Sequence, residues 1–180
     1  MRRLAWIGAG FALLAVALVF WVRAQAGGPP VFVIEDQIEI AAAPEEVWAV
    51  LADFESLAEW NPYLLSLTGD PTPGGEIEIV ILQENWSAPM TLKEVIVSRE
   101  EARLFHWHGS LFLSGLMETD HSFAIEPISS GRSRFIHREE FRGALARLLN
   151  EEFRKPTLSA FRAMDAALAQ RVTEGAPRGR

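Results

Sequence analysis

The chain has 180 residues, of which 49% are hydrophobic, and a formal net charge of −7. Three of its 17 Lys and Arg residues lie before residue 28, whereas all 24 Asp and Glu residues lie after it, so the remainder carries about ten negative charges. Phosphate contacts dominate nucleic-acid affinity, so this balance excludes a nucleic-acid partner. The chain has no cysteine, which excludes disulfides, thiolate nucleophiles and thiolate metal ligands.

Residues 1–26 are predicted to be a membrane anchor or a signal segment. The run Leu4–Val22 is uncharged and, at about 1.5 Å per residue, long enough to cross a hydrocarbon core of about 30 Å. Its length and the following Arg23 favour an uncleaved single-pass anchor, so the membrane is an expected partner through residues 4–22. Because Ala24-Gln25-Ala26 is also a pattern that signal peptidases cut, a domain that is secreted or periplasmic after cleavage at Ala26 is the alternative.

The basic start of the chain, Met1-Arg2-Arg3, favours a cytoplasmic N-terminus with the domain on the extracytoplasmic side. Arg23 reduces the charge asymmetry across the apolar run and leaves the opposite orientation open.

The rest of the chain predicts a linker at 27–32, one α+β domain at 33–172 and a flexible tail at 173–180. Pro44 with two following glutamates starts a helix, and a short helical piece ends at Asn61-Pro62. Strands are predicted at 31–41, 76–84, 90–98, 103–110, 119–126 and 134–142. A closing helix carries the apolar stripe Phe161, Met164, Leu168 and Val172. Runs of strands flanked by helices indicate a curved antiparallel sheet whose apolar face the last helix covers, with room for a cavity between them.

The two strands around residues 126–132 hold the main candidate polar residues. Period-two alternation places Phe135, His137, Glu139 and Phe141 on the inward face, and Arg134, Arg138, Glu140 and Arg142 on the other. Pairing around the turn sets His121 opposite Glu139 and Phe123 opposite His137, although a shift of two residues would pair the two histidines. Such a pair can hold two strands in register, bind a polar ligand group, or act in general acid–base catalysis.

Other aromatic residues are predicted around the cavity. Trp60 and Tyr63 form part of an apolar mouth or, alternatively, a helix-ending turn packed on the sheet. On the strand at 103–110 we place Phe105 and Trp107 inside and His106 and His108 outside. With two histidines on each side of the sheet and no tight spacing, no metal site is expected.

The chain resembles the START-like helix-grip superfamily and, within it, the bacterial polyketide cyclase/dehydrase-like (SRPBCC) proteins, over about residues 33–172. The matching motifs are Ala43-Pro44-Glu45-Glu46-Val47-Trp48 with Leu51 and Asp53, Trp60-Asn61-Pro62, His121-Ser122-Phe123 leading to Glu126-Pro127, Gly131-x-Ser133-Arg134-Phe135 with His137, Glu139, Phe141 and Gly143, and Phe161-Arg162-Ala163-Met164-Asp165-x-x-Leu168. The resemblance implies an antiparallel sheet that grips a C-terminal helix around a hydrophobic pocket. It does not imply one reaction, because proteins that share a fold can bind different ligands and catalyse different reactions.

The sequence therefore predicts a membrane-tethered domain that binds a small hydrophobic ligand, such as a lipid, isoprenoid, quinone or polyketide-like compound, without a cofactor. The predicted ligand-binding residues are Trp60, Tyr63, Phe105, Trp107, His121, Phe123, Phe135, His137, Glu139, Phe141, Phe161 and Met164. The alternatives are a cyclase or dehydratase that uses His121, Glu139 and His137 as catalytic residues, and a protein-interaction module whose cavity is collapsed.

Overall fold

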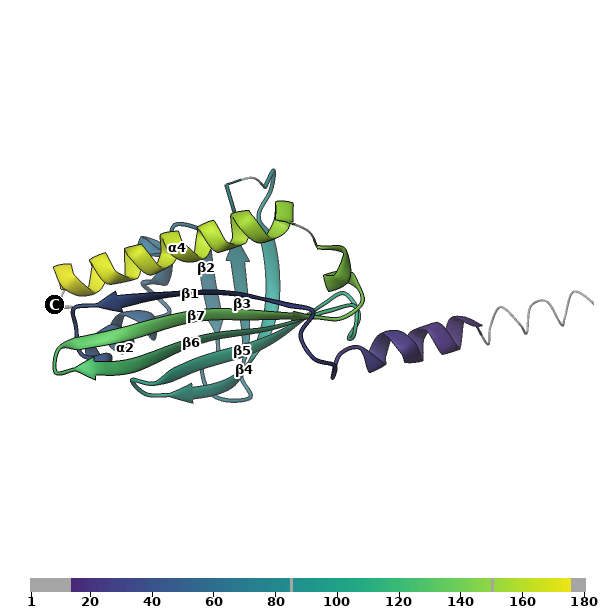
Figure 1. Cartoon of the computed structure of the whole chain (residues 1–180), viewed down its shortest axis with the longest axis horizontal. Coiled ribbons are helices and arrows are strands. Elements are labelled where there is room, and N and C mark those ends of the chain that lie inside the picture. The colour runs from purple at the N-terminus through teal and green to yellow at the C-terminus, as the bar shows by residue number, and fades with distance from the viewer. Residues whose placement is uncertain (1–13, 85, 150, 176–180) are drawn as a thin grey trace, which may run out of the picture.

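The computed structural model describes residues 14–84, 86–149 and 151–175. In this part of the chain, seven strands form one antiparallel sheet in the order β1-β7-β6-β5-β4-β3-β2. The elements are β1 (Phe32–Ile40), α2 (Pro44–Leu51), α3 (Leu57–Trp60), β2 (Leu64–Gly69), β3 (Glu76–Ile81), β4 (Met90–Glu100), β5 (Leu104–Leu111), β6 (Met117–Ser129), β7 (Arg132–Arg142), the 3-10 helix η1 (Leu145–Leu148) and α4 (Glu151–Glu174). Figure 1 shows α4 lying lengthwise over the curved sheet, which confirms the α+β helix-grip fold.

Local sequence explains the predicted helix α2 and the unpredicted strand β2. The helix begins at Pro44, and the Glu46 carboxylate accepts a hydrogen bond of 2.8 Å from the Ala43 backbone N–H, so one free donor at the helix start is satisfied. Strand β2 has a bulge between Leu64 and Ser66. The bulge interrupts the period-two pattern, and for that reason alternation did not predict this edge strand.

The hairpin of β6 and β7 has the predicted register. His121 pairs with Glu139 and Phe123 with His137, so the alternative pairing shifted by two residues is wrong. The strands run further than predicted, to a turn at Ser130 and Gly131 where the glycine has φ +80°. A left-handed backbone is readily adopted by glycine, so the connection is shorter than the predicted turn over residues 126–132.

The buried core lies between the concave face of the sheet and the helices. Phe105, Phe123 and Phe135 from three neighbouring strands are at most 1% exposed, and Met164 and Leu168 of α4 belong to the same cluster. A second cluster, around Phe32, Phe141 and Phe161, lies nearer the start of α4. The predicted inward faces of β5 and β7 are therefore confirmed.

Residues 14–24 form a helix that leaves one end of the domain (Figure 1). Residues 4–13 of the predicted span Leu4–Val22 lie outside the described residues, as do residues 176–180 of the predicted tail. Within the described ranges, none of the helices combines the length and the apolar character that crossing a bilayer requires.

Candidate functional site

Two adjoining chambers lie between the sheet and α4. The inner chamber has a volume of about 70 Å³ and the outer chamber about 490 Å³, the latter within the range of about 300–1,000 Å³ usual for small-molecule sites. Both chambers are lined mainly by apolar side chains. The residues common to both walls are Ile81, Gln83, Leu92, Glu94, Glu139 and Thr157.

Most of the predicted ligand-binding residues line these chambers. Eight contribute to the inner chamber: Tyr63, Phe105, Trp107, His121, Phe123, Glu139, Phe161 and Met164. Glu139 also borders the outer chamber, to which Phe141 contributes. Three predicted residues line neither chamber: Trp60 is half-buried against the core, Phe135 is fully buried, and His137 is buried behind His121.

His121 connects the inner chamber to a buried chain of polar groups. His121 Nε2 lies 2.7 Å from His137 Nε2, and His137 Nδ1 lies 2.8 Å from Asp165 Oδ1 on α4. Both His137 and Asp165 are 0% exposed. No hydrogen bond joins His121 to Glu139 among the described residues, so the expected cross-strand His–Glu bond is replaced by a diagonal His–His bond that continues to an aspartate.

Burial keeps both histidines of this hydrogen-bonded series, His121 and His137, neutral. Burial holds the pKa of His121 well below its ordinary value of 6.5, and a charge on His137 would lower it further. Burial likewise lowers the pKa of His137 to about 3. Burial, together with nearby Asp36, raises the pKa of Asp165 to about 8. The distances fit one proton order, in which a protonated Asp165 donates to His137 Nδ1, His137 Nε2–H donates to His121 Nε2, and His121 Nδ1 holds the last proton.

Two glutamates lie where the two chambers meet. Glu94 on β4 is 5% exposed, and its Oε2 atom has no hydrogen-bond partner among the described residues. Burial raises the pKa of Glu94 to about 8, with a contribution from Asp120. Burial also raises the pKa of Glu139 to about 8, and Glu94 adds to that rise. At neutral pH both carboxyls are therefore largely protonated, as expected for acids held away from water.

Three residues of the site, Glu94, Asp165 and Gly109, were not predicted from the sequence. Asp165 was noted as part of a family motif, but only the fold places it against His137. Gly109 is paired with Glu94 across β4 and β5, and a Cβ atom there would collide with the Glu94 carboxyl. A glutamate opposite a glycine on the next strand can indicate a buried acid, but this pairing could not be read from the sequence because it depends on the register of β4 and β5.

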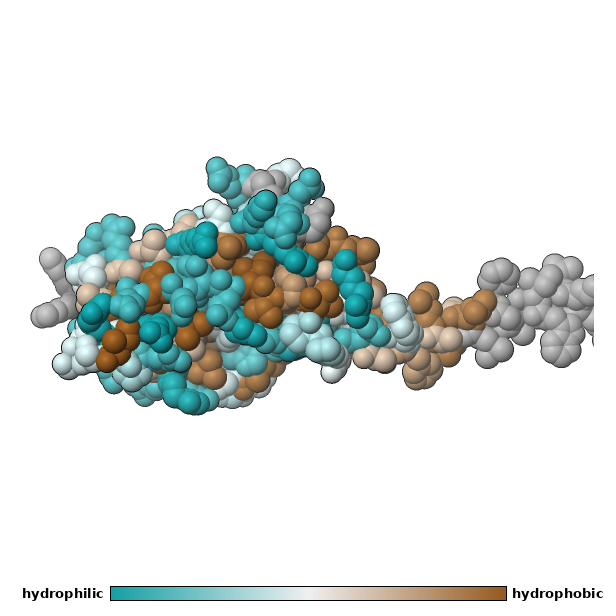
Figure 2. Space-filling view, in the orientation of Figure 1, coloured by the Kyte–Doolittle hydropathy of each residue, from teal (hydrophilic) through white to brown (hydrophobic). Residues whose placement is uncertain are grey.

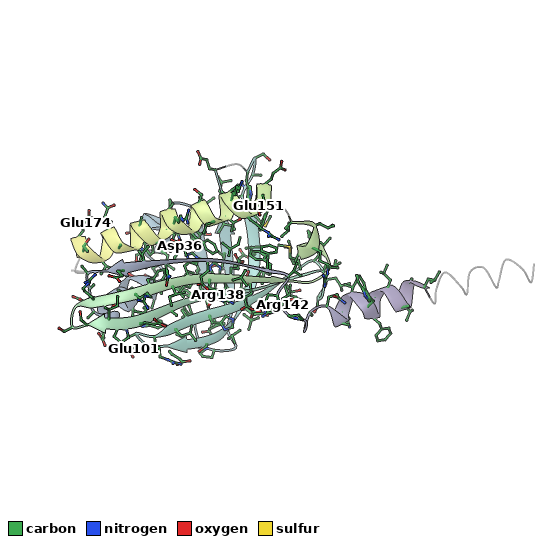
Figure 3. The ribbon with its side chains drawn as sticks, viewed as in Figure 1. Asp36, Glu101, Arg138, Arg142, Glu151 and Glu174 are labelled. Carbon is green, nitrogen blue, oxygen red and sulfur yellow. The ribbon has the colours of Figure 1, made fainter. Side chains whose placement is uncertain are left out.

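The outer face of the sheet carries a separate polar network. His106 and His108 point outward as predicted, and both contact Asp120 Oδ1, at 3.0 and 3.3 Å. Arg138 and Arg142, which project from β7 (Figure 3), form ion pairs with neighbouring carboxylates. Within the described residues, no group of three or more His, Asp or Glu side chains is arranged to hold a metal ion.

The sheet, its closing helix and the enclosed apolar chambers define a helix-grip domain of the hydrophobic-ligand-binding or cyclase-like kind. The family described as "Polyketide cyclase / dehydrase and lipid transport" matches residues 31–173, and the chain belongs to this family. It is an SRPBCC/START-like protein, as its sequence motifs indicated.

Solved structures support the same fold. The ZhuI aromatase/cyclase from Streptomyces sp. R1128 has a TM-score of 0.61 and 16% identity, covering 83% of this chain and 99% of that chain. A START superfamily protein from Mycobacterium smegmatis has a TM-score of 0.65 and 14% identity, covering 79% and 97%. At these identities the likeness shows the fold alone. No curated protein matched the chain in sequence.

Proposed function

We propose that this chain is a membrane-tethered domain that binds a small hydrophobic molecule in its internal cavity. The observation that carries the proposal is the pair of adjoining chambers, whose larger part has a volume of about 490 Å³ and an apolar lining. Apolar surface removed from water contributes about 25 cal/mol per Å², so an apolar ligand gains affinity from filling this space. The few polar groups, led by His121, Glu94 and Glu139, orient its polar part.

The end of the domain next to the N-terminal helix supports the membrane tether. Val22 is buried against the domain, and a Cβ atom on Gly115 would collide with the Val22 carbonyl, so the helix closely contacts the β5–β6 loop. In the same loop Phe112 is 82% exposed and has φ +69°, an unfavourable backbone for a bulky residue. Leu148 of η1 is 75% exposed. Figure 2 shows apolar residues on the N-terminal helix and at this end of the domain.

We propose that this apolar end faces the bilayer in which residues 4–22 are inserted, with the domain on the extracytoplasmic side. A ligand that partitions into the bilayer would then have a short path to the cavity. The mass of the mature protein tests the tether, since retention of residues 1–26 is expected and loss of 26 residues indicates a cleaved signal.

A matched pair of variants tests binding in the cavity. Thr119 lines the outer chamber, and Thr119→Phe fills part of it. Thr68→Phe makes the same change on an exposed strand residue that lines neither chamber. A fluorescent apolar probe titrated into the full-length protein should bind the wild type and Thr68→Phe alike and Thr119→Phe more weakly. Equal binding by all three would place the probe outside the cavity.

The buried chain from Asp165 through His137 to His121 favours a second candidate, a cyclase- or dehydratase-type enzyme. Such a chain can carry a proton to or from a bound molecule without a charged histidine, which suits acid–base chemistry in an apolar site. Asp165→Asn cannot pass a proton along the chain, and Glu139→Gln removes the second acid. A ligand recovered from the protein should then be turned over by the wild type and not by Asp165→Asn; if it is bound but never altered by the wild type, the enzyme candidate is refuted.

A further inference from the structure

Glu94 is an unpartnered acid that points into the cavity wall. Its side chain borders both chambers, it is 5% exposed, and Oε2 has no hydrogen-bond partner among the described residues. A buried carboxyl oxygen without a partner is costly, so its presence in a native fold calls for an explanation, and a bound ligand is one. The carboxyl occupies the space that a side chain at Gly109, on the neighbouring strand β5, would otherwise fill.

A second acid lies at the same place. Glu139 on β7 also borders both chambers, and the charge of Glu94 acts on it. Strands β4 and β7 are separated by two strands in the sheet, so the curvature of the sheet brings these two carboxyls to one cavity. The junction of the chambers is therefore a site with two acids.

The ionisable groups around this junction are mainly acids. Besides burial, nearby acids raise the pKa of each group: Asp120 raises that of Glu94, and Glu94 raises that of Glu139. Glu139 and Asp165 likewise add to the effect of burial in raising the pKa of the Tyr63 hydroxyl. Among the described lining residues Lys93 is the one lysine or arginine, and it is exposed, alternating with Glu94 along β4. His121 and His137 are neutral. An anionic head group would find no buried cation to pair with here, whereas a cation could be paired by a carboxyl that gives up its proton.

We propose that the cavity takes a hydrophobic molecule that carries a basic nitrogen, with the protonated amine held between Glu94 and Glu139. This inference rests on the proposed function, since it names the class of ligand for the same cavity. The ammonium group donates to the unpartnered Glu94 Oε2 and to Glu139, and the aromatic rings of Trp107 and Phe105 line the adjacent wall, where a cation is also favoured.

The sizes of the chambers define where the rest of the molecule lies. The inner chamber of about 70 Å³ admits only a small apolar substituent, whereas the outer chamber of about 490 Å³ takes the bulk of the molecule. The nitrogen is thus flanked by a small and a large apolar group, or ends a large one.

Three probes with one ring system and different charges test the inference. They are 1-naphthylmethylamine, 1-naphthylmethanol and 1-naphthoic acid, titrated calorimetrically at pH 7 into the full-length protein in two buffers of different ionisation enthalpy. A charge-assisted hydrogen bond should make the amine bind about tenfold to a hundredfold more tightly than the alcohol, with the acid weaker still. Because the carboxyls start protonated, binding of the ammonium should release about one proton, which the two buffers reveal as different heats.

Variants identify the site. Glu94→Gln and Glu139→Gln, singly and together, should remove the preference for the amine over the alcohol, together with the proton release. Glu78→Gln, an exposed glutamate on β3, should behave as the wild type. Similar affinities for all three probes, or an amine preference that survives in the double variant, would overturn the inference while the cavity function stands. If none of the probes binds, the proposed function itself fails and the inference fails with it.

Discussion

Replacing Glu94 with glutamine should make the protein more stable at alkaline pH. The side chain is buried, lacks a partner for Oε2, and must ionise inside the cavity as the pH rises. Burial raises the pKa of Glu94 from its ordinary value of 4.5 to about 8. The native state therefore holds a proton that the unfolded chain has lost between these two values, and stability falls as the pH rises through that window.

The magnitude follows from this difference in pKa. At about 1.4 kcal/mol for each pKa unit, ionising Glu94 in the folded protein costs up to about 5 kcal/mol at pH 9. Local relaxation and water entering the chamber reduce such penalties, so we expect a measured effect of about 2–4 kcal/mol. Glutamine has a similar shape and no charge. The free energy of unfolding of Glu94→Gln should thus lie within about 1 kcal/mol of that of the wild type at pH 5 and exceed it by about 2–4 kcal/mol at pH 9.

Denaturant titrations of the full-length protein in mild detergent, from pH 5 to pH 9, measure this difference. Glu78→Gln serves as the control, because Glu78 is exposed on the adjacent strand β3 and lines neither chamber. Its curve should run parallel to that of the wild type. Should Glu94→Gln also run parallel to the wild type, Glu94 ionises freely in the folded protein and the reasoning about the cavity acids is refuted.

Three further predictions concern the packing, the histidine chain and the apolar end of the domain. Gly109→Ala should destabilise the fold by about 1–3 kcal/mol, and Glu94→Ala in the same chain should remove most of that loss; additive effects in denaturant would contradict the contact. Burial lowers the pKa of His137 from 6.5 to about 3, so its NMR signals should not titrate between pH 5 and 8. Its contribution should make the fold less stable as the pH falls below about 6.5, where the unfolded chain takes up the proton, and this loss should level off near pH 3. An NMR midpoint near 6.5 would refute its neutral buried state. The chain lacks cysteine, so a polarity-sensitive dye can be attached to one introduced cysteine, either Phe112→Cys or Glu101→Cys at the far end of the domain (Figure 3). In reconstituted vesicles the dye at residue 112 should report an apolar environment and the dye at residue 101 a polar one. Equal polarity at the two positions would contradict bilayer contact.

The fold could be predicted where alternation and helix signals were strong. The inward faces of β5 and β7 and the pairing of His121 with Glu139 follow from period-two patterns and one turn. The turn itself was predicted too long, because Pro127 and Ser129 are residue types typical of turns although β6 continues to Ser129. Strand β2 was missed since its bulge breaks the alternation.

The site could be predicted in part. The aromatic lining comes from inward positions of single strands, which local patterns reveal. The partner of His137 could not be predicted, because Asp165 lies 28 residues away on another element and only the docking of α4 brings the two together. The same holds for Glu94, whose position opposite Gly109 and whose access to both chambers depend on the curvature of the whole sheet.

The cavity ligand is tested most directly by native mass spectrometry of the full-length protein, purified gently from the cell that produces it, followed by solvent extraction. We expect one discrete hydrophobic molecule, bound to the wild type and to Thr68→Phe, depleted in Thr119→Phe, and released on denaturation. If the protein carries no ligand in any preparation, and if it binds neither the naphthyl amine, the alcohol nor the acid, ligand binding is contradicted. That result would favour a protein-interaction module.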